Sequence, residues 1–86
     1  MPYIKKFSRD CYEERLEPLL DLVSRDGSPA MLNYLISKLC RAYLGDNASY
    51  ETLNDAVGVL ECAKIELYRR MIAPYEDRKI AENGDL

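Results

Sequence analysis

The spacing of apolar residues predicts helix along almost the whole chain. In the segment of about residues 8–26, apolar side chains recur every three or four positions, as one face of a helix requires. These side chains are Tyr12, Leu16, Leu20 and Val23. Ser8 is a suitable N-cap. Pro18 lies inside the segment, so either the helix kinks there or it divides, with Pro18 in the first turn of a second helix.

Turn and capping residues divide the rest of the chain. Gly27-Ser28-Pro29 predicts the end of one helix and the start of the next, which is expected over about residues 29–44. Ser49 caps a long helix expected over about residues 50–73. Pro74 is expected to end or kink that helix before a last short helix at about residues 75–82.

The long helix is apolar on two sides. One side is a stripe interrupted by a single lysine; it comprises Leu53, Ala56, Val57, Leu60, Lys64, Leu67 and Met71. The other side, called the seam below, comprises Gly58, Cys62, Ile65, Arg69 and Ile72. Two apolar faces require two packing partners, so we expect the rest of the fold on one face and a second copy of the chain on the other.

The predicted fold class is therefore all-α. We expect one domain over residues 1–86, a small homo-oligomeric helical bundle with an N-terminal arm at residues 1–7. A chain of this size buries a modest core, which association with other copies commonly supplements.

The composition argues against three kinds of binding partner: metal ions, membranes and nucleic acid. Histidine is absent and the three cysteines show no CxxC spacing, so we expect no metal site. The chain has no leader-like start and no apolar run of membrane-spanning length, which predicts a soluble cytoplasmic protein. A net charge of −3 argues against bulk binding to nucleic acid.

Lys64 has two interpretations. In the first, its stem covers apolar surface while the ammonium reaches water or pairs with Glu61, which is common for lysine. Alternatively, the ammonium meets a ligand anion, with the Tyr68 ring one turn along the helix stacking beside it. The second interpretation predicts a ligand site, with further contacts from a neighbouring chain. Its candidate residues are Lys64, Tyr68, Arg69, Arg70, Glu61 and Tyr34.

Catalysis has little support in the sequence. Histidine, a nucleophile motif and a glycine-rich phosphate loop are all absent, so we expect no catalytic residues, no cofactor and no enzyme activity. An all-α nucleotide pyrophosphohydrolase is a third possibility. However, Glu61 and Glu66 are five residues apart, whereas two ligands on one helix face need a spacing of three or four.

The segments GVLECAKIELYRRMIAPYEDRKIAENGD (residues 58–85), LNYLISKL (residues 32–39) and MPYIKK resemble a family of short uncharacterised proteins encoded by bacteriophages and some bacteria. Phage origin implies the host cytoplasm and suggests, by analogy of type, a small oligomer that sequesters a nucleotide-derived immune signal. The first functional hypothesis is thus an anti-defence protein that binds an anionic nucleotide-like molecule. The alternative is a non-catalytic protein-interaction or structural oligomer module.

Overall fold

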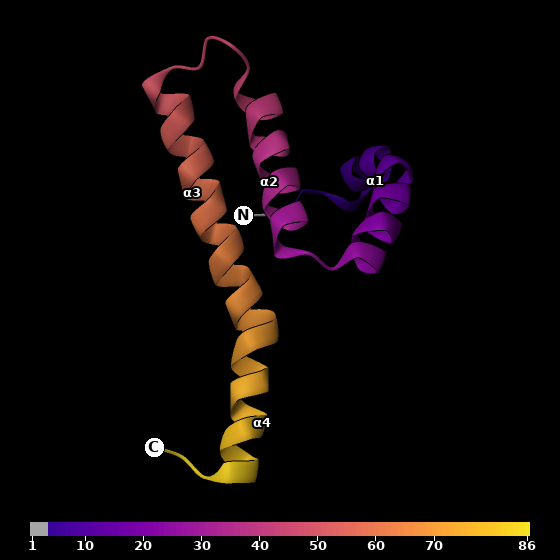
Figure 1. The fold of residues 1–86 in the computed structure, drawn as a ribbon. Coiled ribbons are helices and arrows are strands. Elements are labelled where there is room, and N and C mark those ends of the chain that lie inside the picture. Colours follow the sequence, from indigo (N-terminus) through magenta and orange to yellow (C-terminus); the bar gives the residue numbers. More distant parts are fainter. Residues whose placement is uncertain (1–3) are drawn as a thin grey trace.

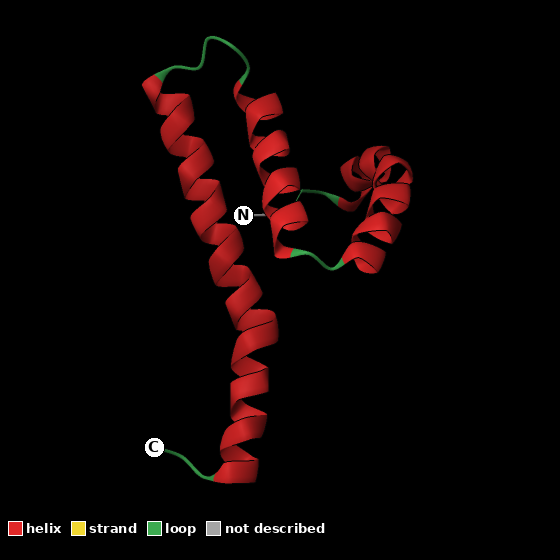
Figure 2. Ribbon diagram, in the orientation of Figure 1, coloured by secondary structure: helices red, strands yellow, loops and turns green. Residues whose placement is uncertain are grey.

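The structure is a computed structural model that describes residues 4–86, and these residues contain helices and no strand (Figure 2). The prediction of an all-helical fold is confirmed. The elements are α1 (Lys6–Asp26), α2 (Pro29–Leu44), α3 (Tyr50–Leu67), the π-helical segment η1 (Tyr68–Ile72) and α4 (Ala73–Asn83).

Helix α1 differs from the prediction at its start. It begins at Lys6, and no side chain caps it, so Ser8 lies within the first turn rather than before it. Residues 1–3 of the expected N-terminal arm lie outside the described residues. One helix runs through Pro18, so of the two predicted alternatives, a kink and a division, the division is wrong.

The two turns between helices use the expected capping residues. Gly27 adopts a left-handed conformation (φ 66°) and its N–H donates to the carbonyl of Val23. The Ser28 hydroxyl then accepts from the N–H of Met31 at 3.3 Å, and the Ser49 hydroxyl starts α3 in the same way. Each serine cap is typically worth about 1 kcal/mol of helix stability.

Of the two outcomes predicted at Pro74, an end and a kink of the long helix, the end is wrong. The elements α3, η1 and α4 form one helical stretch of 34 residues, Tyr50 to Asn83. Within an α-helix the ring of Pro74 would clash with the carbonyl four residues earlier. Here a wider π-helical turn precedes the proline, and the N–H of Ala73 donates to the carbonyl of Tyr68, five residues back. The wider turn accommodates the proline, so the helix continues.

The helices pack only against their neighbours in sequence. In the described part of the chain α2 lies between α1 and α3, α1 contacts no helix but α2, and α4 contacts only η1 (Figure 1). The expected bundle is therefore not closed within one chain. The last 16 residues of the long helix, Tyr68 to Asn83, are called the C-terminal arm below. They extend past α2 without touching α1 or α2.

One chain alone leaves most of its apolar side chains exposed. Among residues 4–86 only Ala56, where α3 faces α2, is buried, at 8% exposed. The surface area is 7943 Å² and the radius of gyration is 16.5 Å. A compact monomer of this size has a surface of about 5,200 Å² and a radius of gyration of about 12 Å. The single chain thus has an open shape.

Candidate functional site

Lys64 and Glu61 lie one turn apart on α3 and form an exposed ion pair. The ammonium nitrogen of Lys64 is 3.0 Å from a carboxylate oxygen of Glu61, and the two side chains are 71% and 57% exposed. An exposed pair of this kind contributes at most about 1 kcal/mol. Within one chain, Lys64 therefore does not sit in a buried core position.

Tyr68 contacts a carboxylate on the far side of the π-helical segment. Its hydroxyl donates to Oε1 of Glu76 at 2.9 Å, across eight residues. In a regular α-helix, residues eight apart lie about 80° apart around the axis. The extra residue that a π-helical turn takes up reduces this angle, so the two side chains share a face. The bond therefore links η1 to α4.

The bond to Glu76, together with the negative charge of that carboxylate, raises the pKa of the Tyr68 phenol. We expect Tyr68 to ionise above the ordinary tyrosine value of about 10, because the neutral phenol donates the bond and the phenolate is repelled. The stabilisation is present at lower pH and is lost as the pH rises through the raised pKa. Titration of ¹³C-labelled tyrosine by NMR measures this value.

The substitution Glu76→Gln should move the Tyr68 midpoint down, towards the ordinary value, and leave the other tyrosines unchanged. Glu82→Gln, further along α4, is the matched control because Glu82 contacts Lys79 rather than Tyr68. A Tyr68 midpoint that does not respond to Glu76→Gln would contradict the bond.

Arg69 and Arg70 converge on one carboxylate. The same oxygen of Glu66 lies 3.1 Å from Nη2 of Arg69 and 2.6 Å from Nε of Arg70. The Glu66 side chain is only 18% exposed, whereas the two arginine side chains are more than half exposed. The two cations thus hold the last turn of α3 to η1, and their outer atoms remain accessible to solvent.

Tyr34 is not with the other proposed ligand residues. It lies on α2, with the ammonium of Lys38 5.9 Å from its ring centroid. It lines a groove between α1 and α2, whereas Lys64, Tyr68, Arg69 and Arg70 lie on α3 and η1. Any site that combines Tyr34 with these residues requires a second chain.

The seam is exposed in the single chain. Ile65 and Ile72 are 55% and 41% exposed, and Cys62 is also exposed. The buried Ala56 marks the α2-facing side of α3, and by helical spacing Ile65 lies roughly 180° away from it around the axis. The seam is therefore on the side of the long helix opposite α2, without a partner in the described part of the chain.

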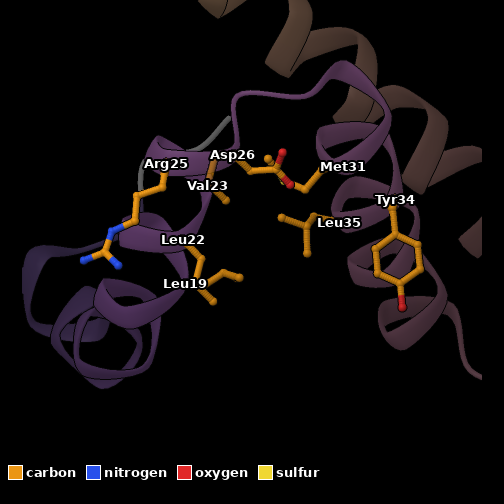
Figure 3. Close-up of a pocket in the computed structure, with 8 residues that line it drawn as sticks. All are labelled: Leu19, Leu22, Val23, Arg25, Asp26, Met31, Tyr34 and Leu35. Atoms are coloured by element: carbon orange, nitrogen blue, oxygen red, sulfur yellow. The ribbon is translucent and has the colours of Figure 1, made fainter.

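The groove between α1 and α2 was not singled out in the sequence. It has a volume of about 490 Å³. Leu19 and Leu22 of α1 and Leu35 of α2 point into the space between the helices, and Arg25 points away (Figure 3). The sequence signal for this groove is that Leu19 and Leu22 widen the apolar face of α1 beyond the stripe that ends at Val23.

Two classes of site have no candidate in residues 4–86. No group of three or more cysteine or acidic side chains there is placed to hold a metal ion. None of the helices in the same residues combines the length and the hydropathy that a membrane span needs.

Fold and site together define an open, three-helix protein whose apolar faces and charged long helix are accessible. The whole chain, residues 1–86, matches the family described as a domain of unknown function, DUF6899, and the protein belongs to that family. Neither the curated proteins nor the solved structures contain a significant match.

Proposed function

We propose that this protein is a homo-oligomeric interaction module in which a second copy covers the seam of the long helix. The observation that carries the proposal is the exposure of apolar side chains that a compact chain of this size would bury. The surface exceeds that of a compact monomer by about 2,700 Å². Obligate homodimers bury about 1,000–2,500 Å² on each partner, so a second copy accounts for an excess of this size.

Gly58 gives independent support for a close contact at the seam. Glycine in a helix interior is less stable than alanine by about 1 kcal/mol. A Cβ atom added at Gly58 would meet nothing within 4 Å, so packing within the chain does not require glycine there. A neighbouring helix that approaches closely at this position would explain the missing side chain.

The mass of the protein in solution tests this proposal. Light scattering at micromolar concentration should give at least twice the chain mass of 9.9 kDa. The mass of a single chain across that concentration range would contradict the proposal. The sequence resemblance favours a phage-encoded protein in the host cytoplasm.

A second candidate function is the binding of an anionic nucleotide-derived molecule by this oligomer. It is favoured by the exposed cationic ends of Lys64, Arg69 and Arg70, which follow one another along the long helix with the Tyr68 ring among them. In one chain they contact carboxylates, so an anion would bind by competing with Glu61 and Glu66. Nucleotides and cyclic nucleotides, including immune signals, are the first ligands to screen by thermal shift.

Lys64→Met separates this candidate from the interaction module. Because the Lys64–Glu61 pair is exposed, we expect the melting temperature to stay nearly unchanged. If Lys64 holds an anion, affinity for any ligand found in the screen should fall by about 1.5–3 kcal/mol, the usual worth of a charge-assisted hydrogen bond.

Lys6→Met, at the start of α1, is the matched control because Lys6 is exposed and α1 does not contact the long helix. Equal affinity of both variants for the ligand would contradict a role for Lys64 in anion binding.

A further inference from the structure

The groove between α1 and α2 lacks a third helix. In a three-helix bundle each helix packs against two others, but α1 contacts α2 alone among the described elements, and α3 lies on the other side of α2 (Figure 1). The walls of the groove are mostly apolar side chains from both helices (Figure 3), and they leave an open volume of about 490 Å³. A helix laid in this groove would complete the bundle.

The chain itself contains a helix of matching length without a packing partner. The C-terminal arm comprises the 5 residues of η1 and the 11 of α4, and α2, which forms one wall of the groove, has 16. The arm contacts no other helix except the α3 that it continues. It extends away from α1 and α2, so it reaches the groove of another molecule more directly than its own (Figure 1).

The arm also has side chains that suit the groove. Met71 is 65% exposed and Tyr75 52% exposed, and a partly exposed tyrosine is a frequent interface anchor. The cationic groups of Arg78 and Lys79 lie 5.8 and 5.6 Å from the Tyr75 ring centroid. If the Tyr75 ring binds in the groove, the cationic groups of Arg78 and Lys79 lie near Asp26, which lines the groove.

The charges nearest the groove agree with such a contact. Asp26 lines the groove, whereas the side chain of Arg25 points away from it (Figure 3). Arg78 and Lys79 flank Tyr75 on the arm, and opposite charges steer association and set the orientation of the partners.

We infer that the C-terminal arm of one copy docks in the α1–α2 groove of a second copy and completes a three-helix bundle between chains. This inference rests on the proposed function, because it requires that copies associate. It adds a contact that the seam does not supply, since the groove is formed by α1 and α2 and the seam lies on the long helix.

Cross-linking between two kinds of full-length chain tests the inference. Both chains carry alanine in place of Cys11, Cys40 and Cys62, and the mass of each is first checked by light scattering. One chain then carries Leu22→Cys in the groove and the other Met71→Cys on the arm. After the two are mixed, a short bismaleimide should join unlike chains at least about tenfold faster than the control pair, because docking raises the effective concentration of the two thiols.

The control replaces Leu22→Cys by Ser24→Cys, which places the same thiol at an exposed position on the other side of α1. An oligomer in which both pairs react equally fast would overturn the docking of the arm and leave the proposed function standing. A chain that remains monomeric before cross-linking would overturn both.

Discussion

Replacing Ile65 by aspartate should convert the oligomer to single chains. Ile65 lies in the seam and is 55% exposed in one chain, so aspartate there meets water in the monomer. In the assembly it would be buried without a partner. Loss of one buried isoleucine from each of two chains costs about 3–6 kcal/mol of association free energy. The dissociation constant should therefore rise by a factor of about 10²–10⁴.

Sedimentation or light scattering over a concentration series measures this change, and circular dichroism shows that the helices are retained. Ala63→Asp is the matched control, because Ala63 is exposed on α3 and lies well around the helix from Ile65. Gly58→Ala is a gentler test of the same surface and should stabilise the isolated helix while it weakens association. If Ile65→Asp leaves the mass of the oligomer unchanged, the seam is not the interface.

Ala56→Asp should strongly destabilise the α2–α3 pair. Ala56 is the one buried residue in residues 4–86, and carboxylates are stable in such positions only with a partner. Cys40 and Tyr43 of α2 line the same small cavity as Ala56, which places Ala56 at the contact between α2 and α3. We expect a loss of about 3–5 kcal/mol, the usual effect of an uncompensated buried charge.

Thermal or urea unfolding followed by circular dichroism measures that loss. The Ala63→Asp variant is again the control, since it makes the same change two turns further along α3 at an exposed position. Equal unfolding midpoints for the two variants would contradict the packing of α2 on α3 at Ala56.

Local sequence signals predicted the helical class and the turns between helices. Gly27, Ser28 and Ser49 act through bonds to atoms at most four residues away, so their effect can be read from a short stretch of sequence. The helix end that Pro74 suggested does not occur, because the outcome depends on the wider turn before the proline. The sequence rule for proline assumes regular α-helical geometry.

The candidate site was less predictable than the helices. Periodicity placed Lys64 within an apolar stripe of α3. It does not indicate how far along α3 the neighbouring helix reaches, and the Lys64 side chain is in fact exposed. The bond from Tyr68 to Glu76 depends on the changed register after η1. The position of Tyr34 in the α1–α2 groove depends on how two helices meet in space, which the pattern of one helix does not specify.

The neighbour-only packing of the helices has a consequence for the order of folding. Contacts between elements join only segments that follow one another in sequence, so little loop-closure entropy opposes their formation. The helices and turns of one chain should form within microseconds to milliseconds, as in other helical proteins with local contacts. Encounter of two chains would then be the slow step, and the rate of recovery after denaturation would depend on protein concentration.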